Sequence, residues 1–237
     1  MISQMLLTAT AGLVNAGEAV AVDQGQYLIG SESPKALKNE RPRHIAALTA
    51  YSIDKRPVSI KEFVVFLDTL LQRVDGKVSC PPNNQGIIGQ LEPPQEIKRL
   101  IRVPSYWLTL TEEGFVLNGL NGAEPVFNAS WEGADAYCRS AGKRLPTEAQ
   151  WETACADSSK ELVMSSKEEW TADWYAADYY RRAPAANPLN DTNTGLKSIR
   201  GGADKRGKIN CSSRSGSKPG TAVMNRTFRC VEHLSRE

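Results

Sequence analysis

The clearest hydrophobic pattern in the chain follows Ser59. Ser59 and Glu62 have the spacing of a capping box, in which each side chain accepts a backbone hydrogen bond at a helix start. Apolar residues then recur every three or four positions, and Asp75-Gly76 ends the pattern. The pattern predicts a helix after Ser59 that ends before Asp75. Its apolar positions are Phe63, Phe66, Leu67, Leu70 and Val74.

Two further helices are predicted in the second half of the chain. One begins at Ser130 and ends at Gly142, and its apolar and small residues follow helical spacing. The other begins at Thr147, whose partner Gln150 completes a second capping box before Cys155. After residue 157 the chain consists of short segments with many turn residues. Helices should therefore be few.

Strands and loops fill the rest of the predicted fold. Residues 24–30 alternate in polarity and end in a glycine, as a strand does before a turn, and residues 45–53 are also strand-like. Residues 31–43 are polar, and residues 80–94 are rich in Pro, Gly and Asn, which predicts exposed loops. The simplest architecture is one compact α+β domain with short strands.

The composition narrows the class of protein without naming a function. Of the 237 residues, 41% are hydrophobic and 24% charged, which argues against disorder, fibres and coiled coils. The net charge of +2 does not indicate a nucleic-acid partner or a membrane surface. No apolar run reaches the roughly 18 residues that a membrane-spanning helix needs.

The N-terminal segment, residues 1–21, has two interpretations. Residues 5–21 are fairly apolar, and Ala19-Val20-Ala21 resembles a signal-peptidase site. Against this, the start of the segment has no basic residue, and Asn15 and Glu18 interrupt the apolar stretch. The segment is either a signal-peptide remnant or an ordinary first strand, and we place the domain at residues 22–237.

A series of motifs from residue 125 onward carries a family resemblance. Gly142-Lys143-Arg144-Leu145-Pro146-Thr147-Glu148 is the most specific, and Trp170-Thr171-Ala172-Asp173-Trp174, Arg200-Gly201-Gly202 and Thr227-Phe228-Arg229-Cys230 follow in order. Together they resemble the formylglycine-generating enzyme, or sulfatase-modifying factor, family. The resemblance implies an irregular α+β fold related to C-type lectins. Fold alone does not fix function, because relatives include oxidases, sulfur-transfer enzymes, siderophore-maturation proteins and non-catalytic binding or regulatory proteins.

The metal sites that the resemblance implies are incomplete in this chain. The family's oxidases hold copper through two cysteine thiolates shortly after the Gly-Gly pair, a ligand type that suits Cu(I), whereas residues 203–211 contain one cysteine here, Cys211. Counting forward from Gly202 places Cys211 at the second copper position. Counting back from the Cys-x-x-Arg-Ser segment makes it a structural cysteine, and this alignment matches more residues. The iron-dependent branch needs two histidines in one cluster, and the chain has only His44 and His233. We expect neither copper nor iron, and we expect His44 to make a structural hydrogen bond.

Two surface sites are weaker expectations. The family's calcium motif is largely replaced, but Glu169 survives as a candidate calcium ligand. Residues 197–229 contain nine basic residues against one acid, Asp204. Either they form a surface for an acidic partner, with Lys205, Arg206 and Lys208 at its centre, or Arg200, Arg214 and Arg229 are internal and pair with carboxylates. The second interpretation is favoured.

The five cysteines complete the sequence-based picture. Their spacing alone is compatible with two bridges and one free thiol, or with buried free thiols. The family resemblance implies the pairs Cys138–Cys230 and Cys155–Cys211, with Cys80 free. Stable bridges would indicate an oxidising compartment, so a periplasmic or secreted protein.

The leading hypothesis is a non-catalytic interaction or regulatory module, for example in a secretion system, with a protein partner. The alternatives are an oxidoreductase or tailoring enzyme of the sulfatase-modifying or siderophore-maturation type, and a lectin-like ligand-binding module.

Overall fold

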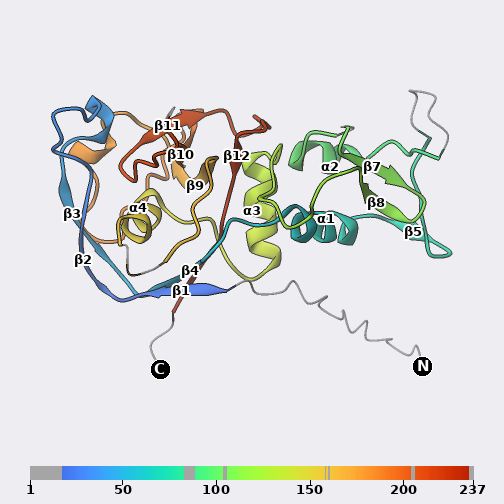
Figure 1. Ribbon diagram of the computed structural model, residues 1–237, viewed down its shortest axis with the longest axis horizontal. Helices are drawn as coiled ribbons and strands as arrows, with labels where there is room; N and C mark the ends of the chain where they lie inside the picture. The colour runs from blue at the N-terminus through green and yellow to red at the C-terminus, as the bar shows by residue number, and fades with distance from the viewer. Residues whose placement is uncertain are drawn as a thin grey trace, which may run out of the picture.

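The computed structural model describes residues 18–82, 89–103, 106–157, 159, 161–203 and 206–234. Within these residues, four α-helices lie among many short strands, as expected for the α+β class (Figure 1). The helices are α1 (Ile60–Thr69), α2 (Gln95–Leu100), α3 (Trp131–Ser140) and α4 (Glu148–Ala156). The strands are β1 (Ala19–Val22), β2 (Gly25–Ile29), β3 (His44–Leu48), β4 (Tyr51–Asp54), β5 (Arg73–Val74), β6 (Lys77–Val78), β7 (Leu108–Thr111), β8 (Gly114–Leu117), β9 (Glu168–Trp174), β10 (Lys197–Gly201), β11 (Arg214–Ser217), β12 (Arg226–Thr227) and β13 (Val231–His233).

The strands of the described residues form a three-stranded sheet, a four-stranded sheet and three separate antiparallel pairs. The three-stranded sheet has the order β1-β4-β13, so its outer strands come from opposite ends of the chain (Figure 1). The four-stranded sheet has the order β11-β10-β9-β12, with β12 parallel to β9. The pairs β2–β3, β5–β6 and β7–β8 are antiparallel. Helix α4 packs beside β2, β9 and β10, which places it at the centre of one half of the molecule.

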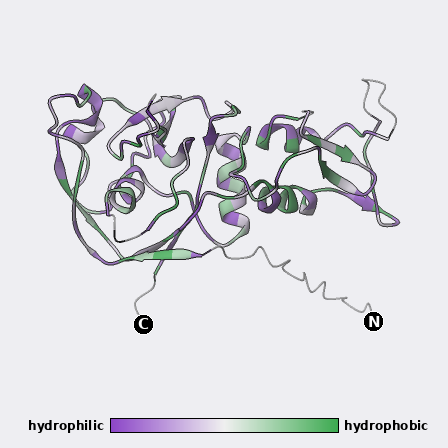
Figure 2. Ribbon diagram, in the orientation of Figure 1, coloured by the Kyte–Doolittle hydropathy of each residue, from purple (hydrophilic) through white to green (hydrophobic). Residues whose placement is uncertain are grey.

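The hydrophobic core is divided into two clusters of buried side chains. The larger cluster joins α1, α2, α3, β7 and β8, and includes Phe63, Trp107 and Tyr137. The smaller cluster joins the sheet β1-β4-β13 to β2, β3 and α4. Figure 2 shows hydrophobic residues concentrated along α1 and polar residues spread through the half that contains β2 and β3.

The predicted capping boxes are confirmed at both helix starts. At α1 the Ser59 hydroxyl accepts from the Glu62 N–H, and the Glu62 carboxylate accepts from the Ser59 N–H at 2.7 Å. At α4 the same exchange joins Thr147 and Gln150. Ser130 caps α3 as predicted, accepting from the Gly133 N–H.

The first predicted helix is too long at its C-terminal end. Helix α1 ends at Thr69, and Val74 lies in strand β5 with 62% of its surface exposed. Asp75 and Gly76 both have positive φ angles, which is the backbone of a two-residue hairpin turn between β5 and β6. The turn residues therefore mark a hairpin rather than a helix end.

Other boundaries also differ from the sequence-based expectation. The strand-like stretch 45–53 is two strands, β3 and β4, in different sheets. Helix α2 and the hairpin β7–β8 were not predicted. Within the predicted exposed loop 80–94, residues 83–88 lie outside the described residues, and Leu91 pairs with both Pro82 and Leu110. Around Leu91 the segment therefore pairs with β7 and is not a free loop.

Helices α2 and α3 meet at a glycine. A Cβ atom on Gly133 would lie 2.1 Å from the Leu100 carbonyl oxygen, so only glycine permits this approach. The Ser130 hydroxyl also donates to the carbonyl of Arg99 at 2.6 Å. The contact fixes α3 against α2.

The described N-terminal residues form a strand. Residues 19–22 pair with β4, and this strand crosses the predicted domain boundary between residues 21 and 22. Cleavage after Ala21 would remove three of its four residues, and it stays a prediction. No helix in the described part of the chain is long and apolar enough to cross a membrane.

Candidate functional site

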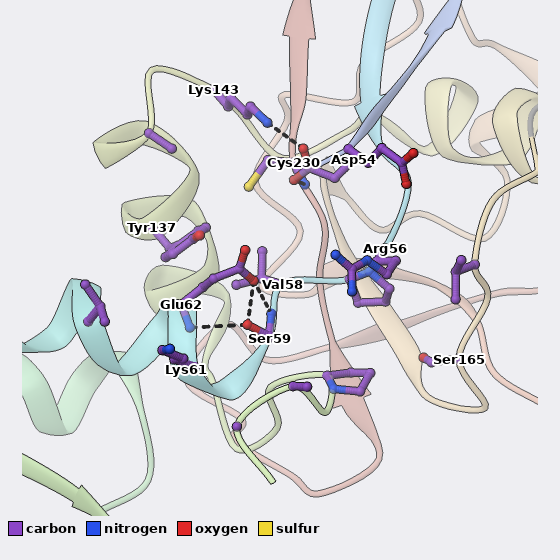
Figure 3. A pocket seen from close by; sticks show the side chains of 18 of the residues that line it. Asp54, Arg56, Val58, Ser59, Lys61, Glu62, Tyr137, Lys143, Ser165 and Cys230 are labelled. Carbon is purple, nitrogen blue, oxygen red and sulfur yellow. Dashed lines mark hydrogen bonds and ion pairs between the residues drawn. The ribbon is translucent and has the colours of Figure 1, made fainter. Parts of the chain in front are cut away.

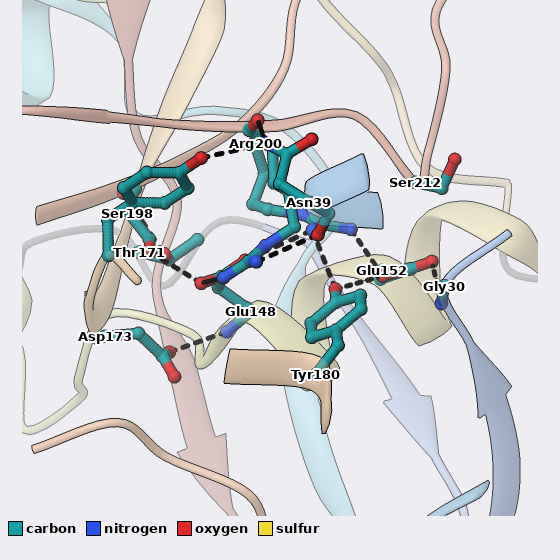
Figure 4. A network of polar contacts seen from close by, with 12 residues as sticks. Gly30, Asn39, Glu148, Glu152, Thr171, Asp173, Tyr180, Ser198, Arg200 and Ser212 are labelled. Atoms are coloured by element: carbon teal, nitrogen blue, oxygen red, sulfur yellow. Dashed lines mark hydrogen bonds and ion pairs between the residues drawn. The ribbon is translucent and has the colours of Figure 1, made fainter. Parts of the chain in front are cut away.

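Helix α4 presents two buried carboxylates to the strands that pack against it. Glu148 and Glu152 are one turn apart and are 2% and 3% exposed. Arg214 binds Glu148 with two nitrogens, each at 2.6 Å from a carboxylate oxygen. The Ser198 hydroxyl donates a further hydrogen bond to Glu148 at 2.5 Å (Figure 4). A buried carboxylate is tolerated here because charged and polar donors surround it.

Arg200 connects both carboxylates to the rest of this half. Its guanidinium, fully buried, donates to Glu152 at 2.5 Å, to Glu148 at 3.2 Å and to the Cys211 carbonyl at 2.6 Å (Figure 4). Tyr180 donates to Glu152 at 2.7 Å, and the other Glu152 oxygen accepts from the Gly30 N–H. One network therefore joins α4 to β2, β10, β11 and the segment around Tyr180.

The charges of this network shift the pKa of neighbouring acids in opposite directions. Burial would raise the pKa of Glu148, but Arg214 and Arg200 hold it below its ordinary value. Asp173 lies close by and has no arginine bound directly; it accepts from the backbone N–H groups of Glu148 and Asn190. Burial and the negative charge of Glu148 raise the pKa of Asp173 to about 7.

Glu169 forms a second buried ion pair, with Arg229. The two side chains make two contacts of 2.7 Å, and the Trp151 indole N–H donates to Glu169 at 2.9 Å. Arg229 also donates to the backbone carbonyls of Asp54 and Lys55. Calcium binding at Glu169 stays a prediction, and these contacts speak against it because they occupy both carboxylate oxygens. Among the described residues, no group of three or more His, Cys, Asp or Glu side chains is placed to hold a metal ion.

The two interpretations of the basic residues are resolved for three arginines. Arg200, Arg214 and Arg229 are at most 3% exposed and pair with carboxylates, which confirms the favoured interpretation. Arg206 and Lys208 are exposed, and Lys205 lies outside the described residues. The partner surface proposed for these three therefore stays a prediction. His44 makes the expected structural hydrogen bond, 2.9 Å from its Nδ1 atom to the Pro42 carbonyl.

Both cysteine pairs implied by the family resemblance are disulfides in the structure. Cys138 is joined to Cys230, and Cys155 to Cys211, with Cα–Cα distances of 5.6 Å. Cys80 is a free thiol and packs against the larger hydrophobic cluster. Copper would need two thiolates, and the one cysteine of the expected stretch is engaged in a bridge to α4. The donor set of this chain therefore does not fit the family's copper site.

A cavity of about 520 Å³ lies beside Cys230, one of the two cysteines of the Cys138–Cys230 bridge (Figure 3). Its walls come from the end of β4, the start of α1, the C-terminal part of α3 and two loops, 122–125 and 163–165. The volume is in the range of small-molecule sites. The apolar lining residues are Pro57, Val58, Val65, Ala123, Pro125, Ala141, Val163 and Met164.

The polar groups of this cavity differ in whether they have partners. Asp54 accepts from the Lys143 ammonium at 2.5 Å and from the Cys230 N–H, and Glu62 is held by Ser59 (Figure 3). The side chains of Arg56 and Lys61 have no hydrogen bond or ion pair with any described residue. The charged side chains on the wall that make no hydrogen bond or ion pair are therefore the two cations, Arg56 and Lys61.

Sequence reasoning missed this cavity. Its residues come from separate segments of the chain, so neither spacing nor a motif brings them together. The Arg56-Pro57-Val58 stretch before the capping box was a visible signal, because it places a charged residue directly before a helix start.

Comparisons with known proteins agree on the family. The model of the sulfatase-modifying factor enzyme 1-like domain matches residues 6–168. A serine/threonine-protein kinase Pkn1 from Chlamydia trachomatis is 25% identical over 92% of this chain and 38% of its own length. A hercynine oxygenase from Mycolicibacterium smegmatis is 32% identical over 60% of this chain and 32% of its own length. The chain thus spans about two fifths or less of the length of these relatives.

Solved structures agree on the fold. PvdO from Pseudomonas aeruginosa superposes with a TM-score of 0.61 at 15% identity, covering 92% of this chain and 95% of that chain. Treponema denticola variable protein 1 gives a TM-score of 0.58 at 14% identity, covering 91% and 95%. At these identities the likeness extends to the fold alone, and the C-type-lectin-like α+β fold expected from sequence is confirmed.

Proposed function

Because the chain belongs to the sulfatase-modifying factor enzyme 1-like domain family, we propose that it is a non-catalytic member that acts as an interaction or regulatory module. The observation that carries this proposal is the Cys155–Cys211 disulfide. It gives Cys211 the structural role of the favoured alignment, and residues 203–210 contain no cysteine that could supply a copper thiolate. Cys80, the free thiol, packs against the larger hydrophobic cluster.

The buried acids and arginines support the same proposal. A tailoring enzyme would need a carboxylate or arginine that reaches substrate. The two carboxylates of Glu148 and Glu152 are nearly inaccessible and are neutralised by Arg200 and Arg214, so all four side chains serve the fold. The match to Pkn1 is also consistent with a module, because a domain like this one forms part of a longer protein there. The kinase activity in that name belongs to the relative.

The two disulfides favour an oxidising compartment, and we place the protein in the periplasm or outside the cell. The partner surface of this proposal is the loop with Lys205, Arg206 and Lys208. Charge reversal of Arg206 and Lys208 together should weaken binding to an acidic partner encoded beside this gene. The matched reversal of Lys35 and Arg181, which are exposed elsewhere, should leave binding unchanged.

The decisive experiment compares the wild type with Cys155→Ser, which leaves Cys211 as a thiol. We expect one reactive thiol per chain in the unreduced denatured wild type, from Cys80. Neither protein should oxidise a cysteine-containing peptide when copper is supplied. Oxidation by the wild type would overturn the proposal, and oxidation by Cys155→Ser alone would identify a latent oxidase controlled by the bridge.

The cavity supports a second candidate function, a ligand-binding module. A pocket of about 520 Å³ with a mostly apolar wall has the size and character of a small-molecule site. A calorimetric titration with candidate ligands tests it directly.

A further inference from the structure

The cavity beside α1 contains a hydroxyl group without a partner. Tyr137 is 4% exposed, and its ring packs against Phe63, Phe66 and Phe228. The side chain lines the cavity, and its hydroxyl makes no hydrogen bond with the described residues (Figure 3). Unlike the Tyr179 hydroxyl, it is not among the fully buried polar atoms that lack a partner, so a ligand in the cavity can reach it.

The rim of the cavity exposes apolar surface. Val65 on α1 and Val163 on the facing loop are each 47% exposed, which is high for side chains of this kind. Met164 and Pro125 extend the same surface inward. An apolar ligand body lying between them would remove this surface from water, which stabilises a complex in proportion to the area covered.

The charges on the wall select the sign of the ligand. Three acids and three bases line the cavity, and each acid is engaged: Glu18 with Lys55, Asp54 with Lys143, and Glu62 with Ser59. Of the three bases, Lys143 is paired, whereas Arg56 and Lys61 have no partner among the described residues. The two unpartnered charges come from one stretch, between β4 and the first turn of α1. An anionic group placed there gains hydrogen bonds without breaking an existing pair.

We propose that this cavity binds an amphipathic organic anion, whose apolar body lies between α1 and the 163–165 loop and whose carboxylate or phosphate group is held by Arg56 and Lys61. Tyr137 donates to a polar atom on the ligand body. The site does not depend on the partner loop or on the absence of catalysis. It can therefore fail or succeed independently of the interaction module proposed above, and it rests on the second candidate function, the ligand-binding module, whose ligand class it specifies.

The test uses a matched set of ten-carbon probes at monomeric concentrations: decanoate, decyl phosphate, decanol and decylammonium. Isothermal titration calorimetry should give decanoate or decyl phosphate an affinity at least about tenfold above that of decanol, because a charged hydrogen bond distinguishes them. Decylammonium should bind most weakly. The ratio between the two anions distinguishes a carboxylate ligand from a phosphate ligand.

Variants locate the binding site. Arg56→Glu should weaken anion binding by about tenfold or more, and the matched reversal Arg181→Glu, at an exposed arginine in the other half, should not. Tyr137→Phe, which keeps the ring packing, should change the affinity for these probes by less than about threefold, because their alkyl chain carries no polar atom for the hydroxyl. Equal affinity for decanoate and decanol, equal effects of the two arginine variants, or no heat of binding for any anion overturns the proposal. Circular dichroism of each variant checks that the fold is kept.

Discussion

Two regions of this domain are held together by different forces. The α1 region, built from α1, α2 and β7–β8, packs around Phe63, Trp107 and Leu67, which are completely buried. The α4 region, built from α4, β9, β10 and β11, has Glu148, Glu152, Arg200 and Arg214 at its centre. One region is stabilised by apolar burial and the other by buried ion pairs between the carboxylates of α4 and arginines of β10 and β11.

The difference predicts how each region responds to change. Apolar packing depends on volume and tolerates exchanges of similar shape. A buried ion-pair network depends on every member, because removing one leaves a charge without compensation. The α4 region should therefore be sensitive to single substitutions and to pH, and the α1 region to neither when volume is kept.

The largest effect should come from the disulfides: Cys138 and Cys230 belong to the hydrophobic cluster that contains the α1 region, and Cys155 lies in α4. Cys138–Cys230 closes 92 residues and Cys155–Cys211 closes 56. In the chain-entropy model these bridges stabilise the fold by about 5 and about 4 kcal/mol. Both bridges can be removed by double substitution to alanine. In a urea titration, Cys138→Ala/Cys230→Ala should lower the free energy of unfolding more than Cys155→Ala/Cys211→Ala does. A larger loss for the second pair would show that the α4 region depends on its bridge more than loop length predicts.

The next largest effect should come from a substitution that breaks the ion-pair network. Arg200→Met should lower the free energy of unfolding by about 3–5 kcal/mol, because Glu152 and Glu148 lose a shared partner while remaining buried. The matched exchange in the α1 region, Leu67→Met, should cost less than about 1.5 kcal/mol, since it keeps volume. Equal costs in a urea titration would contradict the proposed difference between the regions.

How far the sequence predicts this fold depends on how local each feature is. The capping boxes at Ser59 and Thr147 are contained within four residues, and both were predicted correctly. The hairpin β7–β8 was also accessible, because Leu108-Thr109-Leu110-Thr111 alternates before a turn with Gly114. That Asp75-Gly76 is a hairpin turn was not visible, since the same residues also end helices.

The candidate sites were predicted only where family resemblance supplied long-range information. The disulfide pairs followed from it, whereas the partners of Arg200 lie 48 and 52 residues away and spacing does not identify them. The cavity joins residues from Glu18 to Cys230, so its wall exists only after the whole chain has folded. Arg56 and Lys61 are left without partners because Glu18, Asp54 and Glu62 bind Lys55, Lys143 and Ser59, contacts that spacing in the sequence does not predict.

A smaller effect concerns pH in the α4 region. The pKa of Asp173 is raised from its ordinary value of 3.8 to about 7, so the folded state holds a proton that the unfolded state has lost between these values. This contribution to stability is complete at low pH and disappears as the pH rises through 7. Asp173→Asn should therefore flatten the decline of the melting temperature between pH 5 and pH 8. The exposed control Asp191→Asn should keep the wild-type slope, and an unchanged slope in both variants would contradict the assignment.

The smallest effect should come from substituting Lys197, which lies between α3 and β9. The Lys197 ammonium lies 3.9 Å and 4.0 Å from the ring centroids of Trp131 and Trp174 and donates to the Ala172 carbonyl. Burial lowers its pKa to about 8, so between pH 8 and 10.5 the unfolded chain holds more protons than the folded one, and this contribution to stability rises with pH.

Lysine Cε resonances recorded by NMR between pH 6 and 11 should show one group titrating near 8, and that signal should be missing in Lys197→Met. At pH 7 the variant should change the free energy of unfolding by less than about 2 kcal/mol, because the lost cation–π contact and the lost desolvation cost oppose each other. Above pH 8 the wild type should gain stability relative to the variant. A lysine signal that titrates near 10.5 at this position would place the ammonium in water and remove Lys197 from the core that joins α3 to β9.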